Sequence, residues 1–225
     1  MEKLIRSNIP LISSVEKDTF IEASEKAFDC IFDGTSRFYP WVLPSDLPKQ
    51  FKIGVIVGSS GSGKSTLLKE FGQEENPIWD DTKSIISHFD SPDEAILRMG
   101  AVGLNSVPSW YKKYSVLSNG EKFRADLARK IKSNTIIDEY TSVVDRDVAK
   151  AASMALSRYV IKNNINNVVL STCHRDILEW LEPDWVIDTD TGELIEGFFL
   201  SDQKLNLKYI VQRMITGTCL KTITI

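Results

Sequence analysis

The chain has 225 residues, of which 42% are hydrophobic and 26% are charged. These are ordinary globular values, and they exclude a disordered, collagenous or coiled-coil chain. The 27 Lys and Arg residues against 31 Asp and Glu residues give a formal net charge of −4. No overall positive field therefore favours nucleic acid, although a local basic patch would be enough for binding.

The cysteines and the apolar runs bear on the compartment. Cys30, Cys173 and Cys219 are far apart and form no Cys-x-x-Cys pair. This favours free thiols in a reducing compartment over a disulfide framework or a zinc site. No signal-peptide core follows the first residues, and no apolar run approaches the ~20 residues that cross a bilayer. We therefore expect a soluble, cytoplasmic protein with no membrane segment of its own.

The first 50 residues are predicted to pack on the core of a domain formed by residues 51–197. Within them, apolar side chains recur at helical spacing: Phe20, Ala23, Ala27, Phe28 and Ile31. Three prolines between residues 40 and 48 then favour an extended approach to the core. Residues 198–225 are expected to extend the same domain, with a strand-like composition at residues 208–211.

Four short apolar runs are typical of strands buried on both faces. They are residues 52–57, 135–137, 168–170 and 185–187. Helical patterns separate them, including one with its apolar face at residues 148–159. Strands that alternate with helices predict an α/β fold with a parallel sheet.

A glycine-rich motif follows the first buried run. Residues 58–65 read Gly-Ser-Ser-Gly-Ser-Gly-Lys-Ser and fit G-x-x-x-x-G-K-[ST] between a strand and a helix. Backbone N–H groups and the helix N-terminus would hold phosphate oxygens, Lys64 would reach the β- and γ-phosphates, and Ser65 would bind Mg²⁺. The flanking strand and helix disfavour a plain glycine-serine turn. The phosphate-binding residues are Gly58, Ser59, Ser60, Gly61, Ser62, Gly63, Lys64, Ser65 and Thr66.

Two adjacent acids, Asp138 and Glu139, end the run at residues 135–137. The carboxyl ends of parallel strands meet at the edge of a sheet where ligands bind. Asp138 would hold Mg²⁺ directly or through water, and Glu139 would orient or deprotonate the attacking water. Taken alone, two acids after a strand are more often a solvated strand end, but the phosphate-binding motif favours the site.

A third motif, Leu117-Ser118-Asn119-Gly120-Glu121, opens a helix with an apolar face. Serine and glycine at a helix N-terminus form a second anion site. The alternative is an ordinary N-cap, made by Ser118 or Asn119, with Glu121 in the first turn. Two such sites in one domain indicate that the second serves a phosphate bound by another copy.

Together these motifs resemble those of the ATP-binding-cassette (ABC) ATPases, and the resemblance covers about residues 52–197. Residues 117–121 are similar to the family signature Leu-Ser-Gly-Gly-Gln, with Asn at the third position and Glu at the fifth. Residues 137–142 are similar to Leu-Asp-Glu-Pro-Thr-Ser, with Tyr140 in place of proline.

Two further motifs follow in family order. Ser-Val-Val-Asp at residues 142–145 matches the loop that contacts the partner in the dimer and ends at Asp145. Ser-Thr-Cys-His at residues 171–174 puts His174, one of two histidines in the chain, at the position of the family's switch histidine. His88 has no such context and is expected at the surface.

The resemblance implies an α/β, P-loop NTPase fold with an ABC-type core, a mostly parallel sheet and a shortened helical lobe. It implies ATP as substrate and Mg²⁺ as cofactor, with Glu139 and His174 catalytic and with Ser65 and Asp138 as metal ligands. Two copies would form an ATP-dependent head-to-tail homodimer. The phosphate loop of one copy would then face the other, which adds to the nucleotide-binding set Ser118, Asn119, Gly120 and Asp145.

The segment before the signature departs from transporter ATPases. Leu117 follows Lys64 by only 53 positions, and no clear Gln loop is present. Residues 77–82 occupy its place, where Asp80 or Asp81 either serves Mg²⁺ and water or forms an acidic turn. Tyr39 precedes Lys64 at about the distance where the family often keeps an aromatic residue that stacks on the base, but this region could equally belong to the core.

The short lobe and the absent membrane segment favour a soluble dimeric switch that acts on an unknown protein or nucleic-acid partner. Residues 173–185 look closer to soluble ABC ATPases that are sometimes fused to an acetyltransferase-like domain, of which this chain would be the ATPase part. Two alternatives stay open: the ATPase subunit of a membrane transporter, and a P-loop phosphotransferase acting on a small molecule or a nucleic-acid hydroxyl. A basic run around the signature belongs either to the ATP sandwich or to a solvated helix face: Lys112, Lys113, Lys122, Arg124, Arg129, Lys130 and Lys132.

Overall fold

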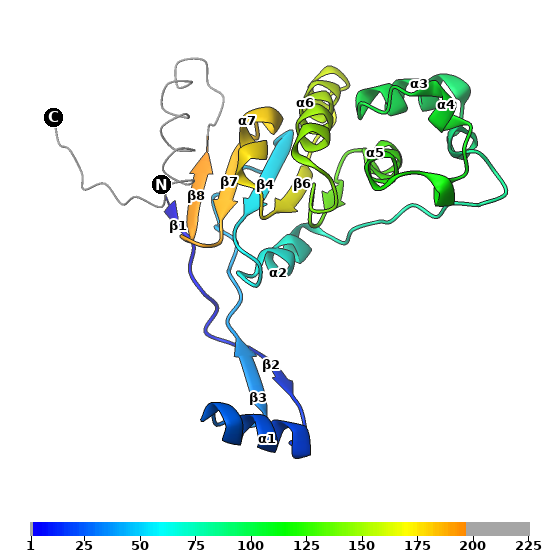
Figure 1. Cartoon of the computed structure of the whole chain (residues 1–225). Helices are drawn as coiled ribbons and strands as arrows, with labels where there is room; N and C mark the ends of the chain where they lie inside the picture. Colours follow the sequence, from blue (N-terminus) through cyan, green and yellow to red (C-terminus); the bar gives the residue numbers. More distant parts are fainter. Residues whose placement is uncertain (1, 197–225) are drawn as a thin grey trace.

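The computed structural model describes residues 2–196, and its centre is a six-stranded sheet in the order β1-β8-β7-β4-β6-β5 (Figure 1). The pairs β4–β6, β4–β7 and β5–β6 are parallel, whereas β8 is antiparallel to β7 and β1 is antiparallel to β8. The prediction of a mostly parallel sheet is therefore confirmed. The strands are β1 (Glu2–Lys3), β4 (Ile53–Val57), β5 (Ile136–Ile137), β6 (Val168–Thr172), β7 (Trp185–Asp188) and β8 (Glu193–Glu196).

The strand order decides what lies beside the phosphate loop. β6 lies between β4, which leads into that loop, and β5, which ends at the two acids. The carboxyl ends of β4, β5 and β6 consequently meet at one edge of the sheet, because all three strands run the same way. The motifs at residues 58–66, 138–145 and 171–174 all leave the sheet at this edge.

Helices cover the sheet and build a small lobe. In Figure 1, α3, α4 and α5 lie together at the right, away from β7 and β8. The helices of this part are α2 (Lys64–Leu68), α3 (Pro92–Ala101), α4 (Val107–Trp110), α5 (Asn119–Lys130), α6 (Arg146–Lys162) and α7 (Leu178–Leu181). Short 3-10 turns are η1 (Lys69–Phe71), η2 (Ile85–His88), η3 (Tyr114–Val116) and η4 (Arg175–Ile177).

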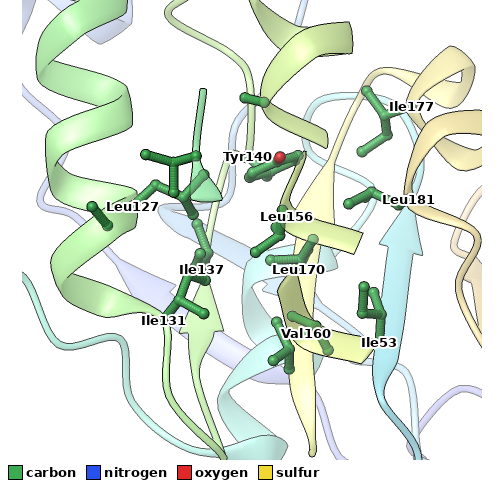
Figure 2. Packing of buried hydrophobic residues seen from close by; sticks show 14 of the residues in the cluster. Ile53, Leu127, Ile131, Ile137, Tyr140, Leu156, Val160, Leu170, Ile177 and Leu181 are labelled. Carbon is green, nitrogen blue, oxygen red and sulfur yellow. The ribbon is translucent and has the colours of Figure 1, made fainter. Parts of the chain in front are cut away.

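Two apolar clusters lie on opposite sides of β4, since successive side chains of a strand point to opposite faces. Ile53, Val55 and Val57 pack in the larger cluster with residues of α5, α6 and α7, as Figure 2 shows for Ile53, Leu156 and Leu181. Ile56 packs in the smaller cluster with Leu67 and Trp185. Gly54 is required here, because a Cβ at this position would lie 2.0 Å from the Trp185 ring.

The N-terminal residues form a separate unit that projects from the sheet (Figure 1). β2 (Leu11–Ser14) pairs antiparallel with β3 (Thr35–Phe38), and α1 (Thr19–Phe28) connects them. The predicted helix is confirmed, but none of its residues is buried, and Phe20 and Phe28 are 82% and 81% exposed. The expectation that residues 1–50 pack on the core is therefore wrong for this unit, because its apolar helix face has no core surface opposite it. Leu4 and Trp41, by contrast, do pack on the smaller cluster.

Other sequence predictions concern single features of the chain. Between residues 2 and 196, no helix is long and apolar enough to cross a membrane. Cys30 and Cys173 are exposed free thiols. Cys219, the strand-like residues 208–211 and the extension at residues 198–225 lie outside the described residues.

Candidate functional site

The glycine-rich loop connects β4 to α2, as the motif predicts. Gly61 and Gly63 have φ values of +78° and +102°, in the left-handed region that favours glycine. At Gly63 a Cβ would also lie 2.7 Å from the Phe38 ring. The loop therefore turns tightly beneath an aromatic side chain of β3.

A cavity of about 350 Å³ opens over this loop. Besides loop residues 60, 61 and 63–66, Glu139 and Phe38 line it. The structure therefore brings Lys64, Ser65 and Thr66 together with Glu139, although more than 70 positions of sequence separate them. Gly58 is buried at the end of β4, and Ser59 and Ser62 bond to the turn between β7 and β8.

Lys64 folds back over its own loop. Its Nζ atom donates a hydrogen bond of 2.7 Å to the Ser59 carbonyl. The ammonium group thus lies within the loop, where the turning backbone exposes N–H groups suited to an anion. An anion in the loop would meet both kinds of donor at once.

Ser65 and Asp138 line a second cavity, of about 380 Å³. The Asp138 carboxylate accepts hydrogen bonds from the Ser171 hydroxyl and from the Glu139 N–H, the latter at 3.0 Å. One hydroxyl and one carboxylate fit Mg²⁺, which takes few protein ligands beside water and substrate phosphates. No group of three or more His, Cys, Asp or Glu side chains is placed to bind a metal by itself within residues 2–196.

The backbone after β5 is unusual at two positions. Glu139 and Thr141 have φ values of +50° and +67°, a conformation that costs energy in residues other than glycine. Tyr140 is 1% exposed, and its hydroxyl lies 3.1 Å from the Ser153 hydroxyl. Burial raises the pKa of the Tyr140 phenol. The buried Tyr140 thus anchors the segment while Glu139 stays exposed at the cavity.

His174 lies beside this segment. Its Nδ1 atom is 3.2 Å from the Thr141 hydroxyl. Partial burial and the positive charge of Arg146 lower the pKa of the imidazole, against the opposing charge of Asp176. The lowered pKa favours the neutral imidazole, which donates through one ring nitrogen and accepts through the other.

The signature residues serve their own helix in this structure. Ser118 is the N-cap of α5: its hydroxyl accepts from the Glu121 N–H, and the Glu121 carboxylate accepts from the Ser118 N–H at 2.9 Å. The hydroxyl of Ser109 donates to the same carboxylate at 2.5 Å, and with the Ser118 bonds it lowers the pKa of Glu121 to about 2. The N-cap interpretation is therefore correct for Ser118, and Glu at the fifth position completes the capping box.

The signature helix and the phosphate loop line different cavities. Asn119 lines a cavity of about 470 Å³ together with Asp138 and Glu139, and no residue of the phosphate loop lines it. Ser118 and Asn119 are exposed. Asp145, at the end of the 142–145 loop, caps α6 by accepting from the Val148 N–H at 2.9 Å.

Phe38 is a site residue that sequence reasoning missed. It lines the phosphate-loop cavity, whereas Tyr39 is 46% exposed and does not line it. The Arg6 guanidinium lies 5.7 Å from the Phe38 ring centre and 3.7 Å from that of Trp41. The aromatic run at residues 38–41 was visible in the sequence, but the pleat of β3 decides which ring faces the loop.

An aromatic cluster holds residues 77–82, the segment that stands in the place of a Gln loop. The Trp79 and Tyr114 rings stack at 4.9 Å, and both side chains donate to the Asp126 carboxylate of α5. Asp80 accepts from both donors of Thr82, as an acidic turn does, and the Asp81 carboxylate accepts from the Ser115 N–H. His88, expected at the surface, is half-buried against Trp79.

Much of the basic run is used within the chain. Arg124 donates to the carbonyls of Gly120 and Gly103, and Arg129 donates to that of Ile78. Lys130 and Lys132 pair with Glu74 and Glu75, each at 2.6 Å. These four side chains therefore support the lobe and the segment before it, which favours a structural role for them.

No protein-family model matches the sequence, and no curated protein matches it significantly. Among solved structures, the chain is similar to a dimeric, post-hydrolysis state of the ATP-binding cassette MJ0796 bound to ADP and Pi. The sequence identity is 13% and the TM-score is 0.53, and the match covers 86% of this chain and 98% of that chain. A dimeric structure of MJ0796, described as a bacterial ABC transporter cassette, is 12% identical, with a TM-score of 0.54 and the same coverage. An ABC transporter in an inward-facing conformation is 17% identical, with a TM-score of 0.50 and coverage of 92% and 89%. At these identities the likeness shows the fold, and the predicted fold class is confirmed.

Proposed function

We propose that this chain, which has the α/β fold of the ATP-binding cassettes, binds ATP with Mg²⁺ and hydrolyses it. The observation that carries the proposal is the 350 Å³ cavity, in which Lys64 and Ser65 of the glycine-rich loop meet Glu139. A loop of backbone N–H groups, a lysine and a nearby carboxylate are what phosphoryl transfer to water requires.

Each residue has a role that its surroundings support. Lys64 moves from the Ser59 carbonyl to the β- and γ-phosphates, whose charge it offsets. Ser65 and Asp138 line one cavity and would hold Mg²⁺ there, and the ion would offset charge on the phosphate oxygens. Glu139 orients the attacking water and accepts its proton.

His174 and Phe38 complete the site at its two ends. The neutral His174, supported by Thr141, is suited to contact the γ-phosphate. Phe38 replaces Tyr39 as the aromatic residue expected to stack on the nucleotide base. An apolar ring at this position tolerates any base, since every base has a face on which a ring can stack.

The proposal includes a head-to-tail dimer formed on ATP. Ser118 and Asn119 are exposed at a helix N-terminus, and neither lines the cavity of its own phosphate loop. A second copy that brings this helix N-terminus to the γ-phosphate would complete the site. The dimer would then act as a switch for a protein or nucleic-acid partner.

A transporter role is the second candidate, because two of the similar structures are those of a bacterial ABC transporter cassette and of an ABC transporter. Ile96 and Leu97 on α3 are 50% and 51% exposed and offer an apolar surface on the lobe. A membrane partner would then be another chain.

The test is the rate of ATP hydrolysis measured against protein concentration, with and without DNA. We expect the rate per chain to rise with concentration as the dimer forms, and Lys64→Ala to remove it. Absence of hydrolysis under all conditions would refute the proposal. A rate independent of concentration, with phosphate transferred to an added acceptor, would favour the phosphotransferase alternative.

A further inference from the structure

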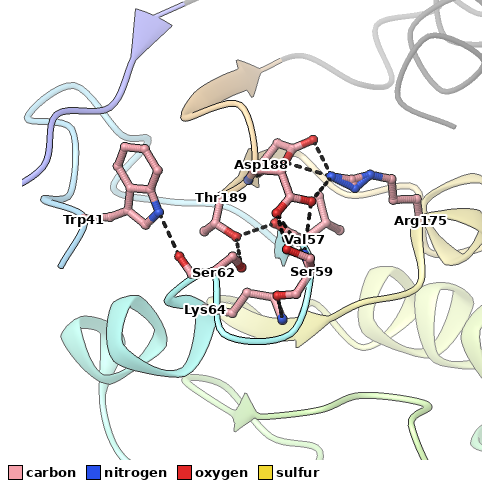
Figure 3. Close-up of polar contacts among 9 residues, drawn as sticks. Trp41, Val57, Ser59, Ser62, Lys64, Arg175, Asp188 and Thr189 are labelled. Carbon is pink, nitrogen blue, oxygen red and sulfur yellow. Dashed lines mark hydrogen bonds and ion pairs between the residues drawn. The ribbon is translucent and has the colours of Figure 1, made fainter. Parts of the chain in front are cut away.

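The turn between β7 and β8 holds the phosphate loop through side-chain hydrogen bonds (Figure 3). The Thr189 hydroxyl lies 2.6 Å from the Ser62 hydroxyl and donates to the Val57 carbonyl at 3.0 Å. Asp190, next in the chain, accepts from the Ser59 N–H at 3.0 Å and from the Ser59 hydroxyl at 2.7 Å. Both ends of the loop's first turn are thus attached to residues 189 and 190.

Asp190 is tied in turn to a buried ion pair. Arg175 donates to the Asp190 carboxylate at 2.8 Å and to both oxygens of Asp188 at 2.9 Å. The Asp188 side chain is 1% exposed and that of Arg175 is 16% exposed, so this pair is stiff and hardly screened by solvent. Partial burial opposes ionisation of Asp190, but the Ser59 bonds and the charges of Arg175 and Lys64 hold its pKa below the ordinary value.

These contacts connect the phosphate loop with Arg175, and Arg175 directly follows His174 in the chain. The path runs from Ser59 through Asp190 to Arg175, and Arg175 is covalently joined to His174. The Ser59 carbonyl also accepts the hydrogen bond that the Lys64 ammonium group donates. When Lys64 leaves for a phosphate, Ser59 is held by Asp190 and by a longer bond of 3.3 Å from the Ser62 N–H.

We propose that Asp190 is a positioning residue that couples the occupied phosphate loop to His174 through Arg175. This inference rests on the proposed ATPase function. Asp190 itself is about one-third exposed and does not line the cavity, so it has no contact with the nucleotide. Its role is to fix the distance between the loop that binds phosphate and the loop that carries His174.

The test uses ADP, because ADP lacks the γ-phosphate that His174 is proposed to contact. Cys173 lines the cavity over the phosphate loop, whereas residues 175–177 do not, so the measurement uses residues 175–177. A change there on ADP binding must travel through protein contacts. Amide hydrogen exchange would be measured in the full chain with and without ADP and Mg²⁺. In the wild type we expect protection both at residues 58–66 and at residues 175–177. In Asp190→Ala we expect protection at residues 58–66 to remain and that at residues 175–177 to be lost.

Asp184→Ala is the matched control. Asp184 lies at the other end of the same strand and accepts from the N–H groups of Lys52 and Ile53 at 2.5 and 3.1 Å, as Asp190 does from Ser59. Loss of a carboxylate beside β4 is thus common to both variants, and the control is expected to keep both protected segments. If Asp190→Ala does not fold, Asp190→Asn keeps the size of the side chain and a weaker acceptor, and it should reduce the protection at residues 175–177.

The outcomes separate the two proposals. Equal protection of residues 175–177 in the wild type and in the Asp190 variant that folds, or no protection there in the wild type, would overturn the coupling. Loss of that protection in Asp184→Ala would also overturn the coupling, because weakening either end of β7 would then be enough to remove the protection. If ADP protects no part of residues 58–66 in the wild type, the nucleotide-binding proposal itself fails.

Discussion

Within residues 2–196, two helix starts carry serine and glycine, at residues 58–66 and at residues 118–121, and their surroundings differ. At the first, Glu139 and Lys64 line one cavity, and residues 189 and 190 form hydrogen bonds to the loop. At the second, the Ser118 hydroxyl forms its hydrogen bonds with Glu121 in the first turn of its own helix. A helix N-terminus therefore becomes a phosphate-binding site only when other segments of the protein supply charged side chains and exclude water. At Ser118, a second chain would have to supply both.

The largest expected effect is at Glu139, which lines the cavities of both regions. Glu139→Gln should keep ATP binding and lower turnover about 100- to 10,000-fold, because the amide keeps the shape but accepts no proton. Gel filtration should show a dimer trapped with ATP. The exposed Glu179→Gln serves as control and should turn over normally. Normal turnover in Glu139→Gln would remove this residue as the base.

Ser118→Arg tests the second region alone. ATP should still bind to the single chain, but the ATP-dependent dimer should be lost and turnover should fall about 100-fold, since the side chain blocks a γ-phosphate from the helix N-terminus. Ser91→Arg, which changes the N-cap of α3 in the same way, separates this effect from loss of a cap. A dimer that survives in Ser118→Arg would contradict the sandwich.

A mixture of Ser118→Arg and Lys64→Ala chains sharpens the same test. In a head-to-tail dimer one composite site carries both changes and the other carries neither, so part of the activity should return. Light scattering would establish that the mixed dimer forms. If that dimer is inactive, either both sites must act together or the arrangement is wrong.

Lys64→Ala probes the first region. ATP affinity should fall about 10- to 150-fold, the worth of a hydrogen bond to a charged group. Titration calorimetry on the single chain measures it, with Lys162→Ala, which changes an exposed lysine at the end of α6, as control. An unchanged affinity would take Lys64 out of the site.

The smallest effect concerns the cap of α5. The pKa of Glu121 is lowered to about 2, so its contribution to stability is present above its unfolded value near 4.5 and is lost as the pH falls toward 2. Glu121→Gln should therefore lose less stability than the wild type between pH 5 and pH 2, by about 0.5–1 kcal/mol after solvent screening. Urea unfolding across this range measures the difference, and parallel curves would contradict the assignment.

Several elements followed from the sequence because their causes are local. The apolar run at residues 53–57, the glycines of the loop and the N-cap at Ser118 each act within a few residues. The sequence also showed an apolar helix face at residues 19–28, but whether that face would be buried depended on surfaces that no local pattern describes.

By itself, then, the sequence determined the strand–loop–helix of the phosphate loop and the acids that end β5, since backbone sterics and burial act over short stretches. Only the tertiary structure decided that β6 lies between those strands, that Phe38 rather than Tyr39 faces the loop, and that Asp190 holds Ser59 across 131 positions of sequence. The sequence does not distinguish a carboxylate on a turn that is solvated by water from one that accepts a hydrogen bond from a distant backbone N–H. The pairing of β7 with β4 and β8 brings Asp190 to the loop, and that pairing depends on packing over the whole sheet.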